Sequence, residues 1–258
     1  MEYFKNVSLL ITHYNRPKSL ERLLSAFDAL ECKFEEIVVS DDGSKSEHQI
    51  ALRTLQSKFA FRLIESVTNK GLGNNVNKGQ RAVTSTMTLY VQEDFVPTEM
   101  FPGRFRIALD LMEQNQDLDI IRLYAYYAYP YLRPYSDDFS EMLIKPYYMN
   151  YTKIYYYSDH PHLRRSNFLE KFGEYQEGLA GDRTEYRMCL SFIQNNGKGL
   201  FYNNFKDLFV QENSEIEPST MTRSTLTSSD NPLISTLRYV YRQLKYNFDI
   251  NFYKPKKN

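Results

Sequence analysis

Two short apolar runs near the start of the chain, each followed at once by polar residues, constrain the fold more than any other feature. The runs are 7–11 and 37–40, and their composition and length predict buried strands of a parallel sheet. The polar residues that follow them are Thr12, Tyr14, Arg16, Asp41 and Asp42. Ligands of such sheets bind at the carboxyl ends of the strands. The two clusters therefore predict one crevice whose donors, acceptors and negative charge suit the base and ribose of a nucleotide.

Strand and helix patterns alternate four times within about the first ninety-five residues, as in a parallel sheet covered by helices. The expected strands are 7–11, 37–40, 61–66 and 88–92. One helix opens at Pro17, a second follows Ser44 as its cap, and a third spans 74–83. The buried face of the second helix is predicted to carry Ile50, Leu52, Leu55 and Phe59. Later patterns predict a strand over 119–124 and helices over 100–115, 166–172, 182–195 and 233–247.

Composition excludes several classes of protein. The chain is 42% hydrophobic and 25% charged, as soluble globular proteins are, and its 32 basic residues balance 32 acidic ones, which argues against binding to nucleic acid. Two cysteines, Cys32 and Cys189, provide neither a disulfide framework nor a cysteine zinc site. We expect neither a signal peptide nor a membrane span, because no stretch has the apolar length of either. We expect a cytoplasmic protein whose C-terminal helix either docks on the domain or contacts the inner face of the membrane peripherally.

Past residue 124 the regular rhythm breaks. Twelve of the 22 tyrosines lie between Tyr124 and Tyr157, where their rings either stack on sugars or pack beneath a site. Residues 212–231 are rich in Ser, Thr and acidic residues and predict a mobile loop or lid.

Glu93 and Asp94 directly follow the strand predicted over 88–92. Charges at the end of a buried strand are costly unless they are paired, hydrated or bound to metal. Mg²⁺ and Mn²⁺ take carboxylate oxygens as ligands together with phosphate oxygens. The alternative is a carboxylate paired with Arg or Lys. The two residues are therefore a candidate metal site.

Four motifs in order resemble the nucleotide-sugar half of family 2 glycosyltransferases. They are the stretch from Val7 to Arg16, Asp41 to Ser44, Asn69 to Gly71 with Asn77 to Gly79, and Glu93 with Asp94. The resemblance covers about the first 100 residues, and more weakly about 165–190. It implies a GT-A-like α/β fold, a Rossmann-type sandwich with a mostly parallel central sheet and a tyrosine-rich acceptor side. We expect a nucleotide-sugar-binding half over 1–100, an acceptor-side half of the same domain over 101–232, and a C-terminal helix and basic tail over 233–258.

The resemblance also implies an activity. It is inverting, metal-assisted transfer of a hexosyl or N-acetylhexosaminyl group from a nucleotide diphosphate donor, expected to be a UDP-sugar, to a hydroxyl of a glycan or lipid-linked acceptor in polysaccharide biosynthesis. Another reading is a non-catalytic relative that binds nucleotide sugars or glycans, because Gln92-Glu93-Asp94 departs from the usual Asp-x-Asp. A sugar-nucleotide pyrophosphorylase is disfavoured, because the first strand is not followed by a glycine-rich loop.

On the donor side, the resemblance makes Asp42 the base contact, with Thr12 and Tyr14 around base and ribose. For Asp41, nucleotide contact and a purely structural turn are evenly balanced. Arg16 either approaches a phosphate or is a solvated arginine before a helix. The loop of Lys70 and Gly71 either approaches the ligand or is an ordinary turn, and Asn77 either orients this loop or faces the sugar.

At the acidic motif, the resemblance implies Mg²⁺ or Mn²⁺ on the donor diphosphate, which would neutralise the departing nucleoside diphosphate. Because Gln92-Glu93-Asp94 departs from the usual Asp-x-Asp, Asp94 is the safer ligand, and Glu93 is expected to contact the sugar or a metal-bound water.

On the acceptor side, a carboxylate at a helix start is expected to be the general base. Asp182 is our choice, since it opens the helix over 182–195, although Asp is also a favoured helix cap. Glu177 and Glu185 are rivals. His160 and His162 are expected to line the acceptor side or to pack. Arg164 is expected on the acceptor side, where it either holds a phosphate of donor or acceptor or is solvated at a helix start. In some relatives a late histidine completes the metal shell; here Gln211, Glu212, Asn213 or water would take that place.

Overall fold

The computed structural model describes residues 1–145, 147–213, 217 and 232–253. The segment predicted as a loop or lid over 212–231 and the basic tail after 253 therefore lie almost wholly outside the described residues. Only 212, 213 and 217 of that segment are described.

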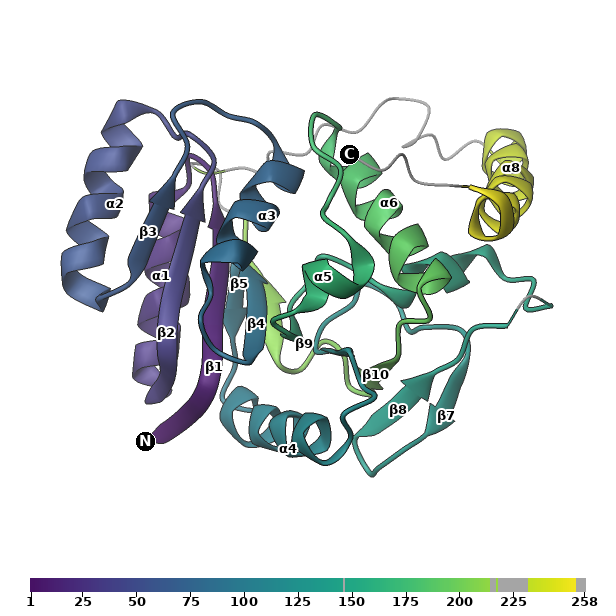
Figure 1. Cartoon of the computed structure of the whole chain (residues 1–258), viewed down its shortest axis with the longest axis horizontal. Coiled ribbons are helices and arrows are strands. Elements are labelled where there is room, and N and C mark those ends of the chain that lie inside the picture. The colour runs from purple at the N-terminus through teal and green to yellow at the C-terminus, as the bar shows by residue number, and fades with distance from the viewer. Residues whose placement is uncertain (146, 214–216, 218–231, 254–258) are drawn as a thin grey trace.

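A nine-stranded sheet forms the centre of the described part of the chain (Figure 1). Its strands, in spatial order, are β3 (Arg62–Glu65), β2 (Cys32–Asp41), β1 (Glu2–His13), β4 (Met87–Gln92), β9 (His162–Arg165), β6 (Ile120–Arg122), β10 (Gly199–Tyr202), β8 (Phe139–Met142) and β7 (Leu132–Pro134). From β3 to β4 all neighbours are parallel, as predicted. Beyond β4 the sheet is mixed, because β9 runs antiparallel to both β4 and β6. A small second sheet pairs β5 (Phe95–Pro97) with β11 (Phe209–Gln211).

Helices cover both faces of the large sheet. One face carries α1 (Pro17–Ala29), α2 (Ser46–Phe59) and α4 (Phe101–Gln114). The other carries α3 (Leu72–Ala82), α5 (Phe168–Phe172), α6 (Gly181–Gln194) and the short 3₁₀ helix η1 (Tyr151–Tyr156). The last helix, α8 (Pro232–Phe252), lies at the margin of the molecule beside α6 (Figure 1). The predicted α/β architecture is confirmed.

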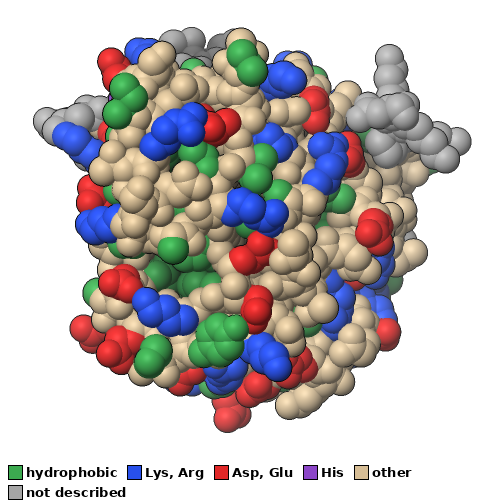
Figure 2. All heavy atoms as spheres, turned by 60° about the vertical axis from the view of Figure 1, so that its left-hand side comes forward, with side chains coloured by type: hydrophobic (Ala, Val, Ile, Leu, Met, Phe, Trp, Pro, Cys, Tyr) green, Lys and Arg blue, Asp and Glu red, His purple; other side chains and the backbone are tan. Residues whose placement is uncertain are grey.

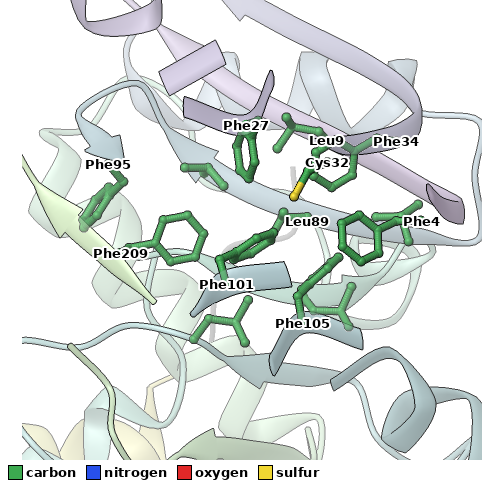
Figure 3. Close-up of a cluster of buried hydrophobic side chains, with 14 of the residues drawn as sticks. Phe4, Leu9, Phe27, Cys32, Phe34, Leu89, Phe95, Phe101, Phe105 and Phe209 are labelled. Carbon is green, nitrogen blue, oxygen red and sulfur yellow. The ribbon is translucent and has the colours of Figure 1, made fainter. Parts of the chain in front are cut away.

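The two hydrophobic cores follow from the alternation of side chains along the strands. On β1, Leu9 and Ile11 point into the core beneath α1, α2 and α4, whereas Leu10 points into the core beneath α3 and α6. The first core is unusually rich in phenylalanine (Figure 3). Its Phe101 and Phe105 rings stack with centroids 4.8 Å apart, and Phe4 meets Phe105 edge-on at 4.8 Å. The second core also buries polar side chains, among them Arg164 and Gln80, which hydrogen-bond to each other.

Two local predictions around α2 are wrong. Ser44 does not cap the helix, which begins after Lys45 without a side-chain cap. Its hydroxyl instead donates to Asp41 Oδ1 at 2.5 Å, because the carboxylate of the same turn is the stronger acceptor. Ile50 is exposed rather than buried, since only Leu52 and Leu55 of this helix are buried on the sheet.

The surface around α2 carries charges of both signs. Figure 2 shows lysine and arginine side chains interspersed with aspartate and glutamate on this side, without a continuous field of one sign. This face therefore offers no basic stripe of the kind that tracks a phosphate backbone.

Candidate functional site

The polar residues after β1, β2 and β4 share one edge of the sheet. Thr12 on β1 pairs with Ser40 of β2 on one side and Gln92 of β4 on the other. Adjacent strands lie about 4.8 Å apart, so the segments that carry Asp42 and Asp94 leave the sheet roughly 10 Å from each other. Thr12 is buried between them, and its hydroxyl lies 3.0 Å from that of Tyr90. The predicted convergence of these strand ends is therefore present.

Asp42 holds the loop that follows β3. Its two carboxylate oxygens accept hydrogen bonds from the backbone amides of Lys70 and Gly71, each at 2.9 Å. Burial raises the pKa of this carboxyl, although the two amides and the cation of Lys78 oppose the shift. Each oxygen retains a further lone pair for a ligand. Tyr14 is half-buried beside this edge, and the side chain of Lys70 is exposed.

Gly43 allows the loop over 68–71 to approach Asp42. Its φ is +69°, and a Cβ at this position would lie 2.4 Å from the backbone carbon of Thr68. Only glycine combines the left-handed conformation with so close a backbone contact. The Asp-Asp-Gly-Ser sequence therefore brings the loop over 68–71 onto Asp42.

Asp41 belongs to the turn. It is fully buried, and its carboxylate lies 2.7 Å from His13 Nδ1 and accepts from the backbone amide and the hydroxyl of Ser44. His13 Nε2 accepts from the amide of Arg16 at 3.1 Å, so the ring is neutral with its proton on Nδ1. Of the two interpretations left open for Asp41, the geometry favours the structural one. His13 itself was missed by the sequence analysis.

Arg16 lies between the two acidic residues. Its Nη1 atom is 3.4 Å from Glu93 Oε1 and 3.4 Å from Asp94 Oδ2, and its side chain is 6% exposed. The prediction of a solvated arginine is therefore wrong. The pairing is loose, because strong charge-assisted contacts are about 2.7–2.9 Å long. Thus the acidic pair does have an arginine partner, as the alternative reading of these residues supposed.

The acidic pair is short of positive charge. Burial, reinforced by the charge of Asp94, raises the pKa of Glu93 to about 8 despite Arg16. Asp94 Oδ1 is buried and accepts no hydrogen bond within the described residues. An unbonded carboxylate oxygen beside a second carboxylate fits a divalent cation that takes its remaining ligands from a diphosphate. The described residues contain no group of three or more His, Cys, Asp or Glu side chains that would hold a metal by themselves.

A segment from the C-terminal side completes this edge. β11 pairs with β5 so that Gln211 lies opposite Phe95, and Gln211 Nε2 donates to Asp94 Oδ2 at 2.9 Å. Asn213 Oδ1 accepts from Arg16 at 2.8 Å. Glu217 accepts from the amides of Lys18 and Ser19 at the start of α1. Gln211 and Asn213 had been named from the sequence as substitutes for a late histidine; Glu217 had not been found, because no local pattern links it to α1.

A chain of contacts leads from Asp94 to α6. The hydroxyl of Tyr126 donates to Gln211 Oε1 at 2.6 Å, and its ring meets that of His160 at 4.5 Å between centroids. His160 Nδ1 lies 2.9 Å from the hydroxyl of Ser158, which donates to Glu185 Oε1 at 2.9 Å. The amide of Asp159 donates to the same oxygen at 3.1 Å. Glu185 is half-buried and is connected to Asp94 through these hydrogen bonds and the one ring contact between Tyr126 and His160.

The three candidate bases differ in surroundings. Asp182 is exposed in the first turn of α6, where its carboxylate accepts from the amide of Arg183. Glu177 is also exposed and is bound by the side-chain amides of Asn74 and Asn77. Asn77 is buried, and its side-chain amide both donates to the carbonyl of Tyr175 and accepts from the backbone amide of Tyr175. Among these carboxylates, only that of Glu185 is in contact with the loop that leads to Asp94.

Arg164 requires a correction. We expected it on the acceptor side or near a phosphate, but it is fully buried. Its guanidinium donates to Gln80 and to the hydroxyls of Tyr157 and Tyr175 inside the core. β9 lies between β4 and β6 in the sheet, so alternate side chains of β9 point into the interior. His162 is likewise buried beneath the site, with Nδ1 2.7 Å from the carbonyl of His160.

Comparisons with known proteins agree with this architecture. A family model described as glycosyl transferase family 2 matches residues 8–173. A dolichol-phosphate mannosyltransferase of Pyrococcus furiosus is 33% identical over 98 residues, which are 37% of this chain and 28% of that protein. S. aureus TarS 1–349 in complex with UDP-GlcNAc has a TM-score of 0.62 at 15% identity, covering 96% of this chain and 73% of that one. A mannosyltransferase from Pyrobaculum calidifontis in complex with GDP-Man and Mn²⁺ has a TM-score of 0.54 at 12% identity, covering 98% and 66%.

Proposed function

We propose a reaction for this chain, which belongs to glycosyl transferase family 2. It transfers a sugar from a nucleotide diphosphate donor to a hydroxyl acceptor, with inversion and with the help of a divalent metal. The observation that carries this proposal is the edge where Asp42 and Asp94 flank β1 beside an unbonded carboxylate oxygen.

The donor would bind at the strand ends. Asp42 would accept from an N–H group of the base or from ribose hydroxyls with its remaining lone pairs, and Tyr14 would border the same space. Lys70 is exposed on the loop that Asp42 anchors, so its cation can reach the diphosphate. Arg16 would exchange its loose contacts with the acidic pair for phosphate oxygens, which its planar guanidinium matches well.

The metal would be Mn²⁺ or Mg²⁺ on Asp94, with Glu93 beside it. When bound, it supplies the positive charge that stabilises the departing diphosphate. Glu93 would then be ionised, and Gln211 would hold Asp94 Oδ2 so that Oδ1 stays turned to the cation.

The base would be Glu185 rather than Asp182. Its Oε1 atom is fixed by two donors, Ser158 Oγ and Asp159 N, so that Oε2 is left to accept the proton of the attacking hydroxyl. Asp182 has no comparable partner facing the site and remains the second candidate.

A UDP-sugar is our first choice of donor, from the sequence resemblance. The relatives named above include one solved with UDP-GlcNAc and one with GDP-Man, so both nucleotides belong in the test. The curated relative carries a lipid phosphate in its name, which supports a lipid-linked acceptor as one class to examine beside glycans.

Donor consumption tests the proposal. The purified chain is incubated with Mn²⁺ and a panel of UDP- and GDP-sugars, and release of UDP or GDP is measured. We expect release with one class of donor, and its loss with EDTA and in Asp94→Asn. Failure to consume any donor, with Tm unchanged by every nucleotide, refutes the proposed function.

A non-catalytic relative is the second candidate. It is favoured by one observation, the arginine that already pairs with both acidic residues. This candidate predicts that nucleotides raise the Tm without any release of UDP or GDP, and that Asp94→Asn leaves the binding of nucleotides intact.

A further inference from the structure

The C-terminal helix α8 carries two apolar faces, only one of which is docked. On the docked face, the Tyr246 ring packs on Tyr186 at 5.0 Å and on Tyr151 at 5.7 Å. Gln194 of α6 donates to the carbonyl oxygens of Ile250 and Tyr253. These contacts fix the helix on the domain, so the orientation of the opposite face is fixed too.

The opposite face is an exposed apolar stripe. It consists of Leu237, Val240, Tyr241, Leu244, Phe248 and Phe252, which are 48–70% exposed. At 100° per residue these six positions fall within about 120° of the helix circumference. They extend over about 22 Å along the axis. Six large apolar side chains in one line are more than the scattered exposure normal for a soluble surface.

The exposed surface continues onto the neighbouring loop. Asn247 donates to the carbonyl of Met149 at 3.2 Å, which places the segment over 147–149 along one flank of the stripe. Met149 and Tyr147 are both about two-thirds exposed. Lys145 lies over the Tyr147 ring, so this flank ends in a cation.

Cations also line the other flank. Arg238, Arg242 and Lys245 fall together beyond the stripe on the helical wheel. Lys245 is paired with Asp249, the sole acidic residue of the helix, and Arg242 lies over the Tyr151 ring of the docked face, so the net charge of this flank comes from the two arginines. The sequence adds Lys254, Lys256 and Lys257 directly afterwards. This concentration of positive charge stands out in a chain whose 32 basic and 32 acidic residues balance.

We propose that the α8 stripe, flanked by the cations of Arg238, Arg242 and Lys145, binds the surface of an anionic lipid bilayer. An interfacial helix lies flat with its apolar face among the acyl chains and its Lys and Arg side chains at the headgroups. A second copy of the chain fits less well, because a symmetric pairing of α8 would bring the like charges of the two basic flanks together. Among the described helices, none is both long and apolar enough to cross the bilayer.

Vesicle binding tests this proposal without any nucleotide, so its outcome is independent of the donor site. The full chain is sedimented with phosphatidylcholine vesicles that contain or lack phosphatidylglycerol. We expect binding to the anionic vesicles that weakens roughly tenfold or more without the anionic lipid or in about 0.5 M NaCl. The variant Leu244→Ser/Phe248→Ser should weaken it at least roughly tenfold at unchanged charge.

The matched control is Ile50→Ser, which removes an exposed apolar side chain from α2 on another part of the molecule. It should bind vesicles as the parent chain does. Leu237→Ser/Tyr241→Ser provides a second stripe variant should the first lose its cooperative thermal transition. Equal binding to both kinds of vesicle, no binding, or stripe variants that bind normally overturn the proposal. A dimer seen by light scattering that the stripe variants abolish, without vesicle binding, also overturns it in favour of a second copy.

Discussion

The buried carboxyl of Glu93 leads to a quantitative prediction. Replacing it by Gln keeps its size but removes a group that is ionised in the unfolded chain at neutral pH and takes up a proton when it is buried in the folded chain. In metal-free buffer, we therefore expect Glu93→Gln to stabilise the protein at neutral pH. The ionised form of Glu93, which burial disfavours, is the form that would face the proposed metal.

The magnitude follows from the pKa of this group. Burial and the neighbouring Asp94 raise the pKa of Glu93 from 4.5 to about 8. Between these values the folded chain keeps a proton that the unfolded chain has lost, so the free energy of unfolding falls as the pH rises. Each pH unit costs about 1.4 kcal/mol, which gives at most about 3 kcal/mol at pH 7 and about 1 kcal/mol at pH 5. The loss is complete only above about pH 8.

Urea denaturation in EDTA measures this difference. At pH 7 the Gln variant should exceed the parent chain by up to about 3 kcal/mol in the free energy of unfolding, and by about 1 kcal/mol or less at pH 5. In a thermal melt the gain corresponds to roughly 6–12 °C at pH 7. Glu113→Gln, which removes an exposed carboxylate from α4, is the control and should show neither effect. A Gln variant no more stable than the parent at pH 7, or one whose gain is independent of pH, refutes the reasoning.

Other changes separate the roles proposed for the site and the fold. Glu185→Gln should lower kcat for transfer roughly 100-fold to 10,000-fold, and Asp182→Asn should lower it only a few-fold; initial rates of UDP or GDP release decide between them. Asp94→Asn should abolish the rise in Tm that Mn²⁺ adds to a nucleoside diphosphate, measured by thermal shift at saturating nucleotide. Gly43→Ala should destabilise the fold by about 1–3 kcal/mol in urea denaturation and weaken nucleotide binding, because its Cβ would strike the next loop. Phe101→Ala should cost about 3–5 kcal/mol in urea denaturation, since its ring is fully buried against other aromatic rings.

The sequence predicted the first half of the fold well for a physical reason. Strands β1 and β4 are buried on both faces, so their sequences are nearly continuous apolar runs. The helices between them repeat their apolar residues with a clear helical period. The polar residues at their ends could be placed at one edge, because parallel strands end together. The same reasoning predicted Asp42 and Asp94 at one edge, and the strands that precede them lie on either side of β1.

The second half could not be predicted in the same way. The strand β9 inserts between β4 and β6 from far along the chain, and no local pattern reports that pairing. This insertion buries Arg164, which the sequence suggested for the site. At the start of α6 the sequence favours Asp182, because an acidic residue there is a local signal. The contacts of Glu185 with Ser158 and Asp159 depend on tertiary structure, so no local pattern predicts them.

Arg16 illustrates a further limit. Its position after β1 predicted a polar group near the strand ends, but the acidic pair that receives it comes from β4, 77 residues away. Sequence spacing alone does not distinguish an arginine that binds a ligand phosphate from one that is the permanent ion-pair partner of a carboxylate. None of the described residues donates to Asp94 Oδ1, which supports the first interpretation, since a permanent partner would satisfy this oxygen.

A crystal structure of the chain grown with Mn²⁺ and the nucleoside diphosphate that raises its Tm most tests the central claim most directly. We predict the base against Asp42, the cation in contact with Asp94 Oδ1, and the guanidinium of Arg16 moved from the acidic pair to a phosphate. Density for the nucleotide at any other place, or an acidic pair that keeps Arg16 as its partner without a cation, would contradict the account.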